Sequence, residues 1–503
     1  MLAPVGTFAT LGAEAPRVDS PPMQPRLPSP FAILAITVAG LFGILTTARG
    51  LVDSDYYWHI TAGRLVAERG ILTTDPFSYT WGGQPWVMHE WLGELLMYWS
   101  VGALGVGVAT FVFGVVSISG PLVVAWALRR SGVPMPPLAL VVALVAYIYT
   151  TYATIRPQAV SWLFLGVLLA GMLLIRPEHR WRPWLAVPLF VVWANVHGLY
   201  VIGLGVLAVY VAFTLLGRTP MAPRRWEMLG LLAACFVGSA LTPAGPAGLL
   251  YPLRYVEAGD WGLRHISEWQ SPNFHDPVQL GLLVLIVALL LNGMRATPGW
   301  LAFMAACGVV GALLATRNVP LTAVLAMPTL ALGLGDRLPA RGRARSARVA
   351  RTRRLMELGL AAVVLIAAVV IVPRLRAVSG DQVIPRSFPV AAVDELEELD
   401  PDARVFAEYH WGGYVINRLY DSGARVFVDG RNDMYDERIL EDYVSIRNAE
   451  PGWESLLDSY GADAILLPPE TALVSGAAEE AGWCEVHRDE VAVLLAHGCV
   501  RGS

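Results

Sequence analysis

Long apolar runs separated by short polar connectors fill the first three quarters of the chain. A helix needs about 20 mostly apolar residues to cross the hydrocarbon core of a bilayer. Helices are the expected form, because lipid offers no hydrogen-bond partners to unpaired backbone groups. The pattern predicts an α-helical polytopic membrane protein with about eleven transmembrane helices, at 32–51, 105–127, 134–152, 159–175, 183–196, 199–216, 228–242, 278–293, 299–315, 318–335 and 355–373.

The composition agrees with a membrane protein and excludes several other classes. Hydrophobic residues make up 55% of the 503 residues, charged residues only 16%, and the mean hydropathy is +0.51. Soluble domains carry about 25% charged residues. A soluble globular protein, a disordered chain and a nucleic-acid binder are therefore excluded, and the lipid bilayer is the first expected partner.

The placement of arginines predicts the orientation, because cytoplasmic loops are enriched in positive charge. All 37 basic residues are Arg, and alternate connectors hold 17 of them, whereas the other connectors hold seven Arg and ten acids. We expect a multi-pass protein of the cell (plasma) membrane whose N-terminus is cytoplasmic. Residues 1–30 would be a disordered cytoplasmic leader, 31–373 the transmembrane domain and 374–503 a domain outside the cytoplasm.

The tail has the pattern of a small α/β domain. Strand-like runs at 403–406, 425–428, 464–467 and a hairpin near 483–495 alternate with helical patterns at 413–420, 439–448 and 453–460. This alternation favours a partly parallel sheet. The turn Asp429-Gly430-Arg431 follows a strand, where it could bind an acceptor glycan, cap a membrane cavity or simply be held by an Asp–Arg pair. Cys484 and Cys499 could form a disulfide in an oxidising space.

The first outer connector, at about 52–104, gathers ionisable residues. Asp55 and His59 would share a helix face, in a helix that ends near Gly70, and a second helix at 86–99 carries His89, Glu90 and Glu94. Carboxylates beside a histidine could act as a general base or hold Mg²⁺ or Mn²⁺, with Asp53 and Asp55 as the metal candidates. The competing interpretation is that these groups cap helices, which is favoured for Asp53, while Glu94 is interpreted as structural.

Other outer helix ends add polar groups that could bind substrate or donor. An arginine there could hold a phosphate by two parallel hydrogen bonds. Alternatively, its long side chain could simply reach the membrane surface and keep its charge in water. A lone histidine is more often a packed, hydrogen-bonded residue. The candidates in this set are Arg156, Gln158, Asn195, His197, Glu268, Arg317 and Asn318.

Several motifs carry a family resemblance. They are Asp53-Ser-Asp55-Tyr-Tyr-Trp58-His59, Thr74-Asp75-Pro76-Phe77-Ser78-Tyr79, Gln84-Pro85-Trp86, His89-Glu90-Trp91-Leu92, Trp411-Gly412-Gly413-Tyr414, Val428-Asp429-Gly430-Arg431 and Tyr435. With these motifs the chain, from about 45 to 500, resembles a group of bacterial membrane proteins similar to the GT-C glycosyltransferases. That family includes polyprenyl-phosphate-dependent mannosyltransferases and arabinosyltransferases.

The resemblance implies a membrane glycosyltransferase that moves a sugar from a polyprenyl-phosphate donor to an acceptor outside the cytoplasm, with inversion. The acceptor would be a glycan, lipid or protein. The family's acidic residue near the outer end of the first span corresponds to Asp53 or Asp55, with Asp55 preferred as the base. Two alternatives remain: a transporter or flippase of a lipid-linked saccharide, and a non-catalytic scaffold with an outer binding domain. The absence of a clear internal repeat and the gathering of polar residues at one face favour the transferase.

Overall fold

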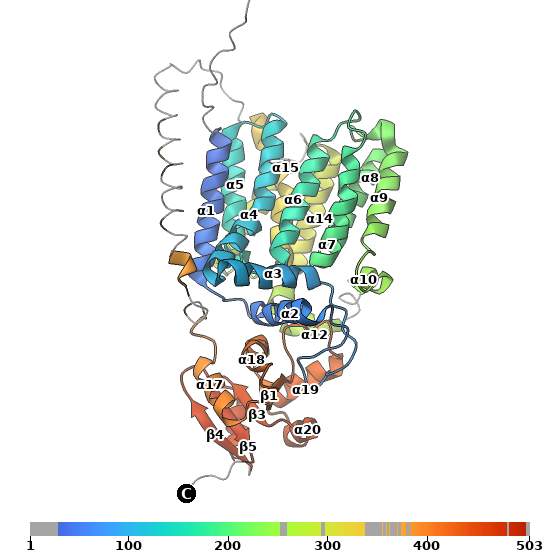
Figure 1. Cartoon of the computed structure of the whole chain (residues 1–503). Coiled ribbons are helices and arrows are strands. Elements are labelled where there is room, and N and C mark those ends of the chain that lie inside the picture. The colour runs from blue at the N-terminus through green and yellow to red at the C-terminus, as the bar shows by residue number, and fades with distance from the viewer. Residues whose placement is uncertain are drawn as a thin grey trace, which may run out of the picture.

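The computed structural model describes residues 29–251, 259–292, 297–337, 374–378, 384–479 and 482–498, together with single positions between 355 and 382. Figure 1 shows a bundle of helices, two helices lying across one end of it, and a small α/β unit beyond them. The bundle helices are α1 (Pro30–Arg49), α4 (Val106–Arg130), α5 (Met135–Tyr152), α6 (Gln158–Leu174), α7 (Ala186–Val196), α8 (Tyr200–Leu215), α9 (Arg225–Gly238), α13 (Leu280–Asn292), α14 (Gly299–Leu314) and α15 (Val319–Arg337).

Ten of the eleven predicted spans coincide with helices of the described residues. Four segments, Pro30–Arg49, Val106–Arg130, Met135–Tyr152 and Thr316–Arg337, are long and apolar enough to cross a membrane by themselves. Shorter apolar helices of 10–17 residues are Gln158–Leu174, Tyr200–Leu215, Leu280–Asn292 and Gly299–Leu314. The span at 355–373 and the leader at 1–30 lie almost entirely outside the described residues, so the count of eleven spans stays a prediction.

Small residues bring the bundle helices into close contact. A Cβ added at Gly120 of α4 would lie 2.0 Å from the Trp162 carbonyl oxygen of α6, and one added at Gly166 would lie 2.4 Å from the Gly120 carbonyl oxygen. Such small residues let backbones approach in membranes, where packing rather than burial from water holds helices together. Helix α1 ends at Arg49, earlier than predicted, because Gly50 takes a positive φ of 71° and stops it.

The two helices across the end of the bundle come from the connector between α1 and α4 (Figure 1). Helix α2 (Asp55–Arg69) ends just before Gly70, as predicted, but α3 (Trp91–Leu104) begins five residues later than the predicted Trp86. The segment before α3 is extended instead, because it pairs with an earlier part of the same connector. The Trp86 amide donates to the Thr73 carbonyl, and Pro85 forms an isolated antiparallel bridge with Thr74. Helices α2 and α3 pack tightly, since a Cβ on Gly63 would lie 2.2 Å from the Glu94 carbonyl oxygen.

The C-terminal unit is a five-stranded sheet with helices around it. Its strand order is β2-β1-β3-β5-β4. Strands β2, β1 and β3 run parallel to one another, whereas β5 runs antiparallel to both of its neighbours, β3 and β4. The predicted partly parallel sheet is therefore confirmed. The strands are β1 (Arg404–Ala407), β2 (Arg425–Val426), β3 (Ala464–Leu467), β4 (Trp483–Arg488) and β5 (Val493–His497). The helices are α17 (Val390–Leu399), α18 (Gly412–Leu419), α19 (Glu437–Arg447), α20 (Trp453–Tyr460) and α21 (Ala472–Glu479).

Short helical segments complete the described chain. They are α10 (Pro246–Leu250), α12 (Gly259–His265), and the single turns Arg182–Leu185, Ala222–Arg224, Ser267–Trp269, Pro277–Gln279, Thr316–Asn318 and Tyr409–Trp411.

The first connector extends the edge of this sheet and so joins the two parts of the molecule. The Tyr79 amide donates to the Val426 carbonyl, and the Val426 amide donates to the Phe77 carbonyl, both at 3.1 Å. Asn417 of α18 also donates to the Thr61 hydroxyl of α2 at 3.1 Å. The C-terminal unit is therefore held by backbone pairing with residues 77–79 of the first connector and by a side-chain contact with α2.

The cysteines divide into two groups. Cys235 and Cys307 are free thiols, whereas Cys484 is disulfide-bonded. Cys499 lies outside the described residues, so its pairing with Cys484 stays a prediction.

Candidate functional site

A cavity of about 220 Å³ lies where the bundle, α2, the start of α3 and the loop after β2 meet. It joins residues that are hundreds of positions apart in the sequence. Ten of the twelve predicted site residues line it: Asp53, Asp55, His59, His89, Glu90, Arg156, Gln158, His197, Glu268 and Arg317.

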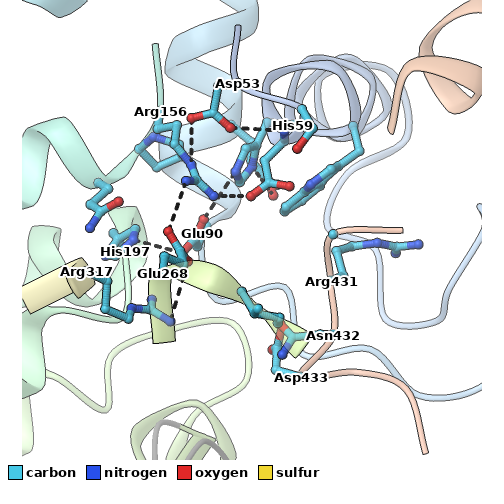
Figure 2. A pocket seen from close by; sticks show the side chains of 18 of the residues that line it. Asp53, His59, Glu90, Arg156, His197, Glu268, Arg317, Arg431, Asn432 and Asp433 are labelled. Atoms are coloured by element: carbon cyan, nitrogen blue, oxygen red, sulfur yellow. Dashed lines mark hydrogen bonds and ion pairs between the residues drawn. The ribbon is translucent and has the colours of Figure 1, made fainter. Parts of the chain in front are cut away.

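Arg156, in the connector between α5 and α6, is the centre of one group of charges (Figure 2). Its Nε lies 3.2 Å from Asp53 Oδ2, its Nη2 pairs with Asp55, and its Nη1 lies 3.8 Å from Glu268 Oε2. On the other side of Glu268, Arg317 Nη1 lies 3.8 Å from Oε1 and its guanidinium sits 4.8 Å from the ring centroid of Trp269.

Asp53 also has the capping role that its sequence position favours. Its Oδ1 accepts from the Asp55 amide at 3.1 Å, which satisfies a free N–H at the start of α2. Its Oδ2 accepts from the Thr154 hydroxyl at 3.0 Å. Asp53 therefore fixes the start of α2 and holds Arg156 at the same time.

Asp55, at the first position of α2, lines the cavity and pairs with Arg156. Burial raises the pKa of its carboxyl to about 7; Arg156 opposes this shift, and Asp53 and Glu268 add to it. The C-terminal unit comes very close here, since a Cβ on Gly430 would lie 2.1 Å from Asp55 Oδ1. Only glycine fits at that position, so the loop after β2 forms a wall of the cavity.

A second group of ionisable residues surrounds Glu90. His59 Nε2 lies 3.8 Å from Glu90 Oε2, and Nε2 of both His89 and His197 lies 3.3 Å from Glu90 Oε1. His59 Nδ1 lies 3.3 Å from Oε1 of Glu94, which is buried at 1% exposure. Asp55, His59 and Glu90, all from the first connector, thus line the same cavity.

Burial and this mutual contact shift the pKa values in opposite directions. Burial lowers the pKa of His59 to about 3 and that of His197 to about 4, in both cases against the charge of Glu90. Burial also acts on His89, but the hydrogen bond and charge of Glu90 raise its pKa to about 9. For Glu90, burial is outweighed by His197 and His89, and its pKa falls below its usual value. Burial and then the charge of Glu90 raise the pKa of Glu94 well above its usual value.

The residues that could hold a metal differ from the predicted pair. One ligand atom each from His59, Glu90 and Glu94 lie within 4.8 Å of one another. Oxygen and imidazole nitrogen ligands suit Mn²⁺ or Zn²⁺. Asp53 and Asp55, the predicted metal ligands, are instead engaged by Arg156. The physical reason is that the Arg156 guanidinium, from the connector between α5 and α6, already forms ion pairs with both carboxylates.

Comparison with known proteins rests on structure alone. No protein-family model matches the chain, and no curated protein sequence matches it significantly. Among solved structures, archaeal oligosaccharyltransferase AglB from Archaeoglobus fulgidus, in complex with an inhibitory peptide and a dolichol-phosphate, aligns at TM-score 0.56 and 11% identity over 86% of this chain and 69% of AglB. ArnT from Cupriavidus metallidurans bound to undecaprenyl phosphate aligns at TM-score 0.53 and 15% identity over 93% of this chain and 97% of ArnT.

A third structure, the mycobacterial arabinofuranosyltransferase AftD, aligns at TM-score 0.50 and 15% identity over 93% of this chain but 41% of AftD. All three are GT-C glycosyltransferases. The chain has a GT-C-like fold. The predicted resemblance to these membrane proteins is therefore confirmed at the level of the fold.

Two predicted site residues lie outside the cavity of this GT-C-like chain. Asn195 accepts from the Trp91 indole at 2.8 Å and donates to the carbonyls of Val191 and Leu241, so it joins α7 to the start of α3. Asn318 donates to the Gly311 carbonyl at 3.0 Å and lines a separate, apolar pocket between α8 and α14. Both are candidates only because they lie at the outer ends of predicted spans, and that position does not specify the direction of a side chain.

Residues of the C-terminal unit also line the cavity. The predicted Asp–Arg pair is present: Arg431 Nη2 lies 2.6 Å from Asp429 Oδ2, and its Nη1 lies 2.8 Å from Asp75 Oδ1. The turn motif predicts that this loop could have a functional role, but it does not predict that the loop covers a cavity formed with the first connector. The lining residues that the sequence did not single out as site residues include Trp58, Trp269, Tyr409, His410, Asn432 and Asp433.

Proposed function

We propose that this chain is a membrane glycosyltransferase that moves a sugar from a polyprenyl-phosphate donor to an acceptor hydroxyl on the extracytoplasmic side. The observation that carries the proposal is the meeting of Asp55 and two arginines, Arg156 and Arg317, in one cavity at the end of the bundle. A base beside phosphate-binding groups is what such a transfer requires. The GT-C-like fold supports the same reaction class, because AglB and ArnT are seen with polyprenyl-type phosphates.

In the proposed reaction, the Asp55 carboxylate accepts the proton of the acceptor hydroxyl. At the same time, the oxygen of that hydroxyl forms a bond to the anomeric carbon of the donor sugar. The bond between that carbon and the donor's phosphate oxygen breaks, and polyprenyl phosphate leaves with the electron pair. Attack opposite the leaving group inverts the configuration. Arg156 holds Asp55 in place through its Nη2, and Asp53 anchors Arg156 from the other side.

The sidedness of the cavity follows from the distribution of charge. The arginine pairs and triplets at 129–130, 176–182 and 218–225 lie in connectors that alternate with those lining the cavity. Positive charge favours the cytoplasm for the first set, and so favours the extracytoplasmic side for the cavity and the C-terminal unit. The N-terminus would then be cytoplasmic.

Arg317 is the arginine that we expect to contact the donor phosphate, because it lines the cavity with Asp55, whereas Arg156 already pairs with both Asp53 and Asp55. Arg317→Ala should weaken binding of undecaprenyl phosphate by about 10- to 100-fold, since a hydrogen bond to a charged group contributes about 1.5–3 kcal/mol. The measurement is a titration of purified protein in detergent with undecaprenyl phosphate, compared with the unphosphorylated alcohol.

The matched control for this prediction is Arg264→Ala. It removes an arginine that lies outside the cavity lining and whose Nη2 lies 3.9 Å from Glu441 Oε1. It should bind undecaprenyl phosphate as the wild type does. Equal binding by Arg317→Ala and the wild type would remove Arg317 from the donor site. Equal affinity of the wild type for the phosphate and for the alcohol would contradict phosphate recognition altogether.

The rate of transfer should depend on pH in a way set by Asp55. The groups that face its carboxyl are Asp53, Arg156, Glu268 and Tyr409, and the raised pKa of about 7 means that it is largely protonated at pH 5. A base must be unprotonated to accept a proton, so kcat/KM should rise tenfold per pH unit below about pH 7 and level off above it. A rise centred near pH 4 would instead indicate an ordinary exposed carboxyl or a different base.

A further inference from the structure

The contact between α2 and α3 holds a buried carboxyl group, that of Glu94, which forms no ion pair with an arginine among the described residues. Glu94 is 1% exposed, and its Oε2 has no hydrogen-bond partner among the described residues. Its other oxygen, Oε1, lies 3.3 Å from Nδ1 of His59. Burying an ionised carboxylate without compensation is expensive, so its presence here calls for a cation or a retained proton.

The neighbouring ligand atoms are arranged for a cation. Atoms of His59, Glu90 and Glu94 come within 4.8 Å of one another, and they belong to two helices fixed at short distance by Gly63. Glu90 is itself held by His89 and His197, so its carboxylate is oriented from the side away from His59. Ligands fixed by second contacts in this way bind metals more tightly than mobile ones.

The charge balance of the cavity points the same way. Its described lining residues carry six carboxyl groups, from Asp53, Asp55, Glu90, Glu94, Glu268 and Asp433, against three guanidiniums, from Arg156, Arg317 and Arg431, and the imidazole of His89, whose pKa is raised to about 9. This surplus of acidic groups works against the arginines that would bind a donor phosphate. A divalent cation next to Glu90 and Glu94 would reduce this effect.

We propose that His59, Glu90 and Glu94 bind one divalent transition-metal ion, of the Mn²⁺ or Zn²⁺ kind. The imidazole ligand favours such ions over Mg²⁺, which prefers oxygen ligands alone. The ion would join the start of α3 to α2, at a residue one turn along α2 from Asp55. This inference deepens the proposed function, but its test uses no sugar donor, so the two can fail separately.

The test measures metal in the full-length protein. After purification without chelator, elemental analysis should find about one equivalent of transition metal per chain. After chelation, calorimetric titration should show binding of Zn²⁺ or Mn²⁺ and at least tenfold weaker binding of Mg²⁺. Glu94→Gln, which keeps the shape of the side chain, and His59→Ala should each abolish the bound equivalent, while the thermal unfolding temperature of the metal-free protein reports whether the variants fold.

The matched control is His410→Ala, which removes another histidine of the cavity that lies outside the three-residue group. It should retain the full equivalent of metal. If the wild type holds no metal and takes up neither Zn²⁺ nor Mn²⁺, Glu94 shares a proton with His59 and the inference is wrong. Loss of metal in His410→Ala as well, or its retention in Glu94→Gln, would place the ion elsewhere and equally overturn it.

Discussion

Asp55→Asn should lower the rate of sugar transfer by about 10²- to 10⁴-fold while leaving donor binding nearly unchanged, because asparagine cannot accept the acceptor's proton. The asparagine keeps the size of the side chain and one oxygen that faces Arg156, so the cavity should retain its shape. The measurement is transfer from polyprenyl-phosphate-linked sugars by protein reconstituted in vesicles, with undecaprenyl phosphate binding measured in parallel.

The control for this experiment is Asp421→Asn, which removes an exposed carboxylate that also pairs with an arginine, Arg64, at 2.9 Å. It should transfer sugar at the wild-type rate. Transfer by Asp55→Asn at the wild-type rate would refute Asp55 as the base. If neither protein transfers sugar but both move lipid-linked saccharides across the vesicle membrane, the chain is a flippase, and the proposed function fails as a whole.

Arg431→Met should destabilise the protein by about 3–5 kcal/mol, because it leaves two buried carboxylates without their common cation. Arg431 is 3% exposed, bridges Asp75 of the first connector and Asp429 of the C-terminal unit, and lies 4.7 Å and 4.8 Å from the ring centroids of Trp86 and Phe77. Methionine fills much of the space but provides no charge. The two parts of the molecule should therefore separate before the rest unfolds.

Thermal unfolding and limited proteolysis measure this effect, with faster cleavage expected in the segment between the bundle and the C-terminal unit. Arg438→Met serves as control, because that arginine is 84% exposed at its side chain and reaches Asp442 only at 3.9 Å. Exposed pairs of this kind contribute about 0–1 kcal/mol. Similar small effects of both substitutions would show that the Asp75–Arg431–Asp429 bridge does not hold the two parts together.

Much of the local structure could be predicted from the sequence. Apolar runs of helical length mark the bundle, and Gly70 marks the end of α2, because glycine adopts the positive φ of 84° found there. The strands of the tail were also predicted within about two residues, since strand-like runs bounded by turn residues are local signals. Asp55 and His59 share a face of α2, as the four-residue spacing predicts.

The start of α3 could not be predicted in the same way. Residues near Trp86 directly precede a helix and share its apolar pattern. They are nevertheless extended and pair with residues 73–75 of the same connector, as the hydrogen bond from the Trp86 amide to the Thr73 carbonyl shows. A tertiary contact thus overrides the local preference. The same limit explains why Asn195 and Asn318 were assigned to the site although their side chains join helices elsewhere.

The sequence by itself determined which segments are apolar helices, which are strands, and that ionisable residues gather in the connectors at one end of the bundle. Only the tertiary structure decided that Arg156 engages Asp53 and Asp55, that Glu94 joins His59 and Glu90, and that the loop around Arg431 closes the cavity. Helix and strand patterns arise from interactions over a few residues. The partners of a charge, in contrast, come from wherever in the chain the fold brings an opposite charge within reach.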